Sequence, residues 1–225
     1  MRPYAAFAVL LAVLLGSVPG WAASPYAGFR SAVAYSENGR DSGRCGTAMA
    51  SDEHARLDVE FRKVGAFTLL VDAEERRLYV LSQKLKAYVS MELEGDARSW
   101  RDLVESASAA IMPQSLGLVS IKEIRREELG RRTVLGHAAE GSRSVFELMF
   151  MGVVRQFTVE AWDSGAVSPF PLKVSLPAGQ EAQAGSAWLE DVASVRVPES
   201  EFMVPEHFTR YTSVMDLLLY ALTAL

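Results

Sequence analysis

The chain has 225 residues, and its 23 basic and 28 acidic residues give a formal net charge of -5 at pH 7. No block of lysine and arginine residues offers the counterion-releasing surface that nucleic acids need, so we expect no nucleic-acid partner. Cys45 is the single cysteine, which excludes an intramolecular disulfide. We expect it to be a small residue in or beside a strand, with a reactive thiol or an intermolecular bridge as the alternatives.

The first 22 residues have the pattern of a cleavable secretory signal. Arg2 precedes an apolar run from Ala5 to Leu15, and Gly20-Trp21-Ala22 supplies small residues at the positions that a signal peptidase reads. The apolar run is shorter than the roughly 20 residues that span a bilayer as a helix, which argues against a retained membrane anchor. We therefore expect an exported, periplasmic protein that is cleaved near Ala22, with residues 23–211 as one domain.

Short β-like runs separated by turn residues dominate the rest of the chain. Leu57, Val59 and Phe61 alternate with charged residues, the period of two expected when one face of a sheet is buried and the other is wet. The polar segment 72–75 between two apolar runs is typical of the turn in an antiparallel hairpin. Strands are predicted at Phe29–Tyr35, Leu57–Phe61, Ala66–Val71, Arg77–Ser82, Lys86–Met91, Val119–Arg125, Ser144–Met151, Val153–Trp162, Leu172–Leu176 and Trp188–Val197.

Two segments have helical patterns instead. Apolar residues from Trp100 to Ile111 recur at helical spacing, and Ser99 with Asp102 resembles a capping box. Residues 212–225 are apolar nearly all round from Val214 onward, which predicts a short helix that is not free in water. We expect this C-terminal helix to be packed on the domain, inserted into a groove, or docked on a partner or a membrane surface.

Residues that commonly carry catalysis do not gather in this sequence. His54, His137 and His207 are far apart, and none pairs with another at metal-ligand spacing. The chain has no Gly-x-Ser-x-Gly elbow, no phosphate-cradling glycine loop and no His-Glu-x-x-His segment. We therefore expect no enzyme activity, no catalytic residue, no metal and no cofactor. A cleft that gathered the histidines with carboxylates would argue for an enzyme instead.

Large apolar and aromatic side chains recur over successive strands, as expected if a curved sheet encloses an apolar interior. That interior is either a filled core or a ligand cavity, and the sequence leaves both readings open. Residues 146–151 are apolar on both alternating sets, which fits a sheet covered by helices. The candidates for a ligand cavity are Phe61, Phe67, Leu69, Tyr79, Leu81, Tyr88, Trp100, Leu103, Phe146, Leu148, Phe157, Trp162 and Trp188.

Several segments occur in a recognisable order. The stretch from Gly46 to Tyr88 contains a charged strand and a hairpin that ends in Leu78-Tyr79-Val80-Leu81. The second half adds four further segments, Leu129–His137, Val159–Trp162, Phe170–Val174 and Phe202–Phe208. In this order the chain resembles the lipoprotein-localisation-factor (LolA/LolB-like) superfamily of exported bacterial proteins. His207-Phe208 departs from the Gly-Tyr-type ending of that pattern, and the apolar tail after Tyr211 lies outside it.

The resemblance implies a mainly β (α+β) fold, an incomplete antiparallel β-barrel or strongly curved sheet whose concave apolar side is covered by helices. It also implies a non-catalytic periplasmic binding protein or carrier for an acyl chain, lipid or lipoprotein. The helix from Trp100 to Ile111 would then be a lid and the C-terminal helix a plug. The alternative is a protein-interaction or sensor module of the cell envelope without a bound lipid, and peripheral contact with a membrane fits either reading.

Overall fold

The computed structural model describes residues 28–37, 40–61, 65–93, 119–150, 152–177, 184–213, 216–217 and 220. The expected signal sequence, residues 1–22, and the expected helix from Trp100 to Ile111 lie outside this described part. Of residues 212–225, the expected C-terminal helix, it contains Thr212 and Ser213, which are not helical, and Asp216, Leu217 and Tyr220, which have helical backbone.

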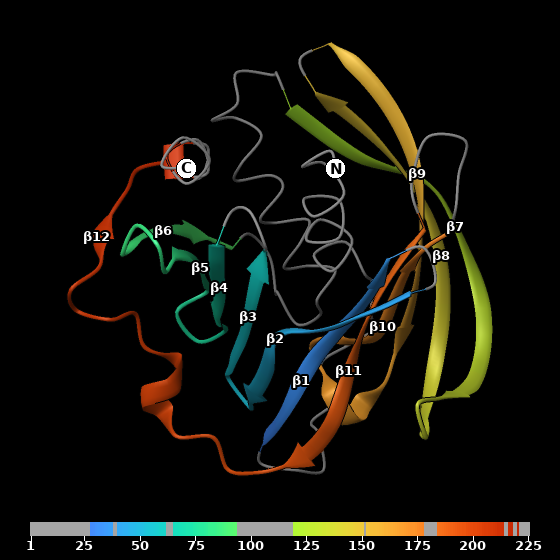
Figure 1. Cartoon of the computed structure of the whole chain (residues 1–225), viewed down its shortest axis with the longest axis horizontal. Helices are drawn as coiled ribbons and strands as arrows, with labels where there is room; N and C mark the ends of the chain where they lie inside the picture. Colours follow the sequence, from blue (N-terminus) through green and yellow to red (C-terminus); the bar gives the residue numbers. More distant parts are fainter. Residues whose placement is uncertain are drawn as a thin grey trace.

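Twelve strands form one sheet in the described part of the chain. In chain order they are β1 (Gly28–Glu37), β2 (Arg40–Ser51), β3 (His54–Phe61), β4 (Gly65–Asp72), β5 (Arg77–Ser82), β6 (Ala87–Glu92), β7 (Val119–Val134), β8 (His137–Phe150), β9 (Val153–Asp163), β10 (Pro171–Leu176), β11 (Gly185–Ser194) and β12 (Thr209–Arg210). In space the order is β12-β6-β5-β4-β3-β2-β1-β11-β10-β9-β8-β7. Every pair is antiparallel except β12 with β6. The end strands β12 and β7 do not pair with each other, so the sheet is open. Figure 1 shows that the sheet is strongly curved.

The predicted strands agree with this sheet in most places. Strand β5 has the predicted bounds, β9 and β10 differ from the prediction by one residue at one end, and β4 and β6 differ by one residue at both ends. The sequence pattern misses β2, because Gly43 and Gly46 weaken the strand signal. It also stops β7 at Arg125, although the strand continues to Val134. Two register shifts in the β7–β8 pairing interrupt the alternation there, which hides the continuation.

The mainly β class and the strongly curved, incomplete sheet are confirmed. The expected cover of helices is not seen in the described part. Its helical turns are η2 (Gly165–Val167), η3 (Glu199–Phe202) and the helical C-terminal residues named above.

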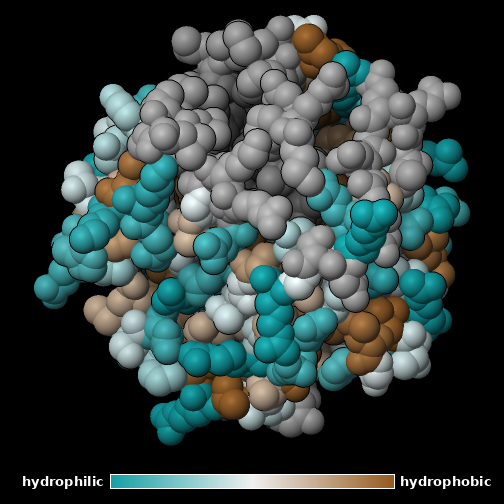
Figure 2. All heavy atoms as spheres, in the orientation of Figure 1, coloured by the Kyte–Doolittle hydropathy of each residue, from teal (hydrophilic) through white to brown (hydrophobic). Residues whose placement is uncertain are grey.

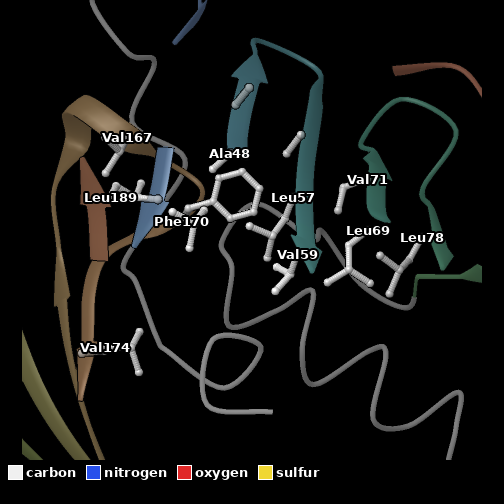
Figure 3. Packing of buried hydrophobic residues seen from close by; sticks show 14 of the residues in the cluster. Ala48, Leu57, Val59, Leu69, Val71, Leu78, Val167, Phe170, Val174 and Leu189 are labelled. Atoms are coloured by element: carbon white, nitrogen blue, oxygen red, sulfur yellow. The ribbon is translucent and has the colours of Figure 1, made fainter. Parts of the chain in front are cut away.

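Alternation along each strand and the pairing register assign the side chains to two faces. One of them, called here the inward face, carries the main core cluster. Its register positions include Val33, Ala48, Leu57, Val59, Phe67, Leu69, Val80, Val89, Val159, Ala161, Val174 and Leu189. Figure 3 shows side chains of this cluster from β2–β5 and from β10–β11 pointing toward the same space. The inward face is therefore shared by the two limbs of the curved sheet.

A C-terminal strap, residues 195–211, crosses the opposite, outward face. Arg30 forms an ion pair with Glu201 at 2.9 Å, and Arg56 Nη1 donates to the Glu201 carbonyl oxygen at 2.6 Å. Further along the strap, Phe208 packs on Leu70 and Leu81 in a second, smaller core cluster. Figure 1 shows the strap running from β11 to β12, at the edge of the sheet beside β6. Elsewhere on the side seen in Figure 2, polar side chains cover most of the described surface and apolar ones form small separate groups.

Candidate ligand-binding site

The inward face is apolar across most of the sheet. On β1–β6 and β10–β11 its buried side chains are aliphatic or aromatic, apart from Ser31 and Ser82. Ser31 satisfies its hydroxyl within the sheet, because its Oγ donates to the carbonyl oxygen of Glu190 at 2.5 Å. This surface is suited to hydrocarbon and offers almost no hydrogen bonds.

The structure divides the predicted cavity residues between the two faces. Those at inward positions are Phe67, Leu69, Phe146, Leu148 and Phe157. Those at outward positions are Tyr79, Leu81, Tyr88, Trp162 and Trp188. Trp100, Leu103 and the side chain of Phe61 lie outside the described part. The described residues of this set therefore do not all lie on one face of the sheet, and their role as a ligand cavity stays a prediction.

Two phenylalanines mark the end of the inward face on β8 and β9. Phe146 and Phe157 are paired across the strands, and their rings stack with centroids 5.6 Å apart. Phe146 is buried, whereas Phe157 and the neighbouring Leu148 are half-buried. Among the predicted cavity residues at inward positions, only Leu148 and Phe157 are partly exposed to solvent, and both lie at this end of the apolar surface.

On the outward face, Tyr79, Leu81 and Tyr88 belong to the second core cluster under the strap. Strand β5 is apolar on both sides, because Leu78 and Val80 face inward while Tyr79 and Leu81 face outward. A pattern with apolar residues on both alternating sets does not say which set faces the main core.

The two outward tryptophans have polar partners. Trp162 is buried and belongs to the main core cluster. Its pairing with Gly141 nevertheless places it on the outward face of β9, opposite to the face of Ala161. A Cβ at Gly141 would lie 2.5 Å from the Trp162 ring, and the Arg132 guanidinium carbon lies 3.5 Å from the ring centroid. The indole is thus held between a glycine backbone and a cation. Trp188 is half-buried and its Nε1 donates to Glu190 Oε1 at 2.9 Å.

The sequence prediction missed a polar stripe on the inward side of β7, β8 and β9. Its members are Glu123, Arg126, Glu128, Arg131, Glu140, Ser142, Ser144 and Asp163. The alternation of side chains along β9 could have revealed part of this stripe. Asp163 follows Ala161 by two residues, and side chains two residues apart in a strand lie on the same face. The predicted strand ended at Trp162, one residue too early to reveal this.

Pairing register brings the stripe together. Arg126 lies opposite Ser144, and Ser144 lies opposite Val159, while Glu140 lies opposite Asp163. Arg126 Nε donates to Glu128 Oε1 at 2.8 Å. Residues from three strands therefore form one polar surface beside the apolar one.

Asp163 is the most perturbed acid of the stripe. Its side chain is buried, and its Oδ1 has no hydrogen-bond partner in the described part of the chain. Burial raises the pKa of Asp163 to about 8, and Glu128 and Glu140 act in the same direction, whereas the charge of Arg126 opposes the rise. The carboxyl is mostly protonated at pH 7.

The three histidines do not converge. His54 begins β3, where its ring stacks on Phe202 and its Nε2 lies 3.6 Å from Asp72 Oδ2, while His137 begins β8 and His207 lies in the strap. Among the described residues, no three or more His, Cys, Asp or Glu side chains are placed to hold a metal ion. Within the same part of the chain, no helix has both the length and the apolar character needed to cross a membrane.

These features define the class of fold: an open, strongly curved and almost wholly antiparallel sheet with an apolar inward face. No family model and no curated protein matches the chain. Among solved structures, PNGF-II is similar with a TM-score of 0.53 and 8% identity, over 86% of this chain and 33% of that one. The chain thus spans about a third of the length of PNGF-II. At this identity the match shows a shared fold and does not extend to function.

Weaker likenesses complete the comparison. An uncharacterized conserved protein from Thermus thermophilus has a TM-score of 0.48 and 9% identity, over 92% of this chain and 98% of that one. The lipoprotein LppX of Mycobacterium tuberculosis has a TM-score of 0.31 and 12% identity, over 88% and 98%. The resemblance to the lipoprotein-localisation superfamily therefore stays a prediction.

Proposed function

We propose that the protein is an exported, non-catalytic carrier that holds an acyl chain of a lipid or lipoprotein against its inward face. The observation that carries the proposal is the continuous apolar inward face of an open sheet. A closed small barrel fills its interior with side chains of its own strands, whereas an open sheet needs another covering for its apolar side. Each buried methylene contributes about 0.8 kcal/mol, so about ten of them suffice for micromolar binding before ordering costs.

The half-buried end of the inward face is the proposed point of entry. Phe157 and Leu148 are partly exposed there, and the deeper residues Val159 and Ala161 continue the apolar surface along β9. An acyl chain that enters beside Phe157 can extend along β9 over Val159 and Ala161 until it reaches Asp163.

We propose residues 23–211 as the carrier domain, with the helix from Trp100 to Ile111 as its lid and residues 212–225 as a plug. Leu217 supports the plug, because it is completely buried in the main core cluster. Its N–H donates to the Ser213 carbonyl oxygen at 3.1 Å, which fits a helical turn at this point. The plug would leave the inward face when an acyl chain occupies it.

The proposal is tested by purifying the protein from the periplasm of an expressing bacterium, recording native mass spectra, and identifying any lipid after organic extraction. A stoichiometric acyl ligand is the expected result. Titration with a fluorescent long-chain fatty acid then compares Phe157→Ser with Val154→Ser, an exposed outward position on the same strand. The first substitution is expected to weaken binding roughly tenfold, because it removes apolar contact area, and the second to have no effect.

In the same titration, a chain that ends at Ser213 is expected to bind the probe more tightly than the full chain. Unchanged uptake together with unchanged stability would argue against the plug. If neither the purified protein nor protein incubated with lipids carries an acyl ligand, the carrier proposal fails.

An envelope interaction module is the second candidate, and one observation favours it. Val153 and Val154, next to the β8–β9 turn, are both 53% exposed, although neighbouring residues of a strand point to opposite faces. Adjacent exposed valines make an apolar tip that a partner can cover. A clean mass without ligand, persisting after incubation with lipids, would favour this function.

A further inference from the structure

Two side chains of the polar stripe each have a buried hydrogen-bonding atom without a partner among the described residues. Asp163 is 5% exposed, and its Oδ1 accepts no hydrogen bond from the described residues. Arg126 Nη1 is also buried and has no acceptor among them. The ion pair of Arg126 is with Glu128, which uses Nε and leaves Nη1 available. Buried polar groups are normally satisfied, so two such atoms on one surface call for a partner.

We infer that Arg126 and Asp163 bind the anionic end-group of the acyl ligand, a carboxylate or a phosphate whose oxygens accept one hydrogen bond from each side chain. This inference rests on the proposed carrier function and names the polar part of its ligand. An arginine N–H bound to a carboxylate or phosphate oxygen is a charge-assisted hydrogen bond, one of the stronger kinds in proteins.

The placement of the two residues fits such a ligand. Asp163 lies two residues beyond Ala161 on β9 and shares its inward face. Arg126 shares that face with Val159, because Ser144 lies between them in the register. An acyl chain lying on Val159 and Ala161 therefore ends at the stripe.

The protonation of Asp163 favours an anion. Because burial raises its pKa to about 8, the carboxyl is mostly protonated at pH 7 and can donate to an oxygen of the ligand. The charged groups that act on it are Arg126 and Glu128 from β7 and Glu140 from β8, and its β10 partner, Pro171, has no titratable group. Above pH 8 the ionised carboxylate would repel the anion.

The test is the affinity of the full chain for three probes of equal chain length: hexadecanoic acid, its methyl ester and hexadecyl phosphate. At pH 7 we expect at least one anionic probe to bind roughly ten- to a hundredfold more tightly than the ester. The tighter anion identifies the end-group as carboxylate or phosphate. Arg126→Gln is expected to remove the preference, because it weakens binding of the anionic probe much more than binding of the ester. Arg125→Gln is the matched control and should keep it, because Arg125 is an exposed arginine of the same strand that lies opposite Val145 on the outward face.

A second variant keeps the inference testable if Arg126→Gln fails to fold. Asp163→Asn retains a donor at the same position, so it should keep the preference at pH 7 but lose the weakening of anion binding that the natural protein shows between pH 7 and pH 9. Equal affinities for the three probes would overturn the inference and leave the carrier function standing. So would an anion preference that survives Arg126→Gln, or a pH dependence that survives Asp163→Asn. Binding of none of the three would overturn both.

Discussion

At the scale of single residues, Gly46 sets how closely β2 and β3 approach. A Cβ at this position would lie 1.9 Å from the backbone carbonyl oxygen of Asp58, which cannot move aside as a flexible side chain would. We expect Gly46→Ala to lower the free energy of unfolding by about 3 kcal/mol, the upper part of the usual range for overpacking. Urea denaturation measures the loss. Gly165→Ala, where a Cβ meets no atom within 4 Å, is the control and should change little. Equal losses in both variants would contradict the steric argument.

Asp163 couples stability to pH. Its pKa is 3.8 when unperturbed and about 8 in the folded protein, so the folded state binds this proton more tightly than the unfolded state. The resulting stabilisation is complete below about pH 4 and is lost as the pH rises to about 8, by up to about 1.4 kcal/mol for each pH unit. Asp163→Asn should lack this loss.

Urea denaturation of the natural protein and Asp163→Asn at several pH values between 4 and 9 measures the difference. The free energies of unfolding are expected to diverge in favour of the variant as the pH rises, and to run parallel above about pH 8. Parallel curves over the whole range would show that Asp163 is ionised in the folded state.

At the scale of elements, the strap is held by β12 and by one aromatic side chain. The N–H groups of Thr209 and Tyr211 donate to the carbonyl oxygens of Lys86 and Tyr88 at 2.8 and 2.7 Å, and Phe208 is buried against the outward face of the sheet. We expect Phe208→Ala to cost about 3 kcal/mol, the lower end of the range for a buried phenylalanine, because its cluster is small.

Hydrogen exchange tests whether that loss releases the strap. The amides of Thr209 and Tyr211 should lose protection in Phe208→Ala before those of β4 and β5 do. Met203→Ala alters an exposed strap residue and should leave the exchange unchanged. Protection of β12 that survives Phe208→Ala would mean that the hydrogen bonds with β6 hold the strap without this ring.

The elements themselves differ in how far the sequence predicts them. The β4–β5 hairpin was predicted nearly to the residue, because two apolar runs and a polar turn are contiguous in the chain. Strand β12 was not predicted, since two residues carry no periodicity and pair in parallel with a strand about 120 residues earlier. Cys45 lies in β2, as expected of a small residue in a strand, and burial raises its pKa to about 11.

At the scale of the whole molecule, β1 joins the two halves of the chain. It pairs with β2 on one side and with β11 on the other, so that Val33 lies opposite both Gly46 and Leu189. This junction makes one curved sheet of two meanders and gives the inward face its continuity. The local sequence pattern of β1 does not predict that β11 is its partner. Pairing between strands so far apart in the sequence depends on the apolar burial that the whole sheet gains.

The sequence by itself determined the mainly β class, most strand positions and the apolar character of the interior, since alternation and turn residues act between neighbours in the chain. Only the tertiary structure decided which apolar set of each strand faces inward. In β5 both alternating sets of side chains are apolar, so the packing of the neighbouring strands and the strap determines which set faces inward. It also decided that Arg126 and Asp163 share one surface, because their strands are brought together by long-range pairing that no local pattern encodes.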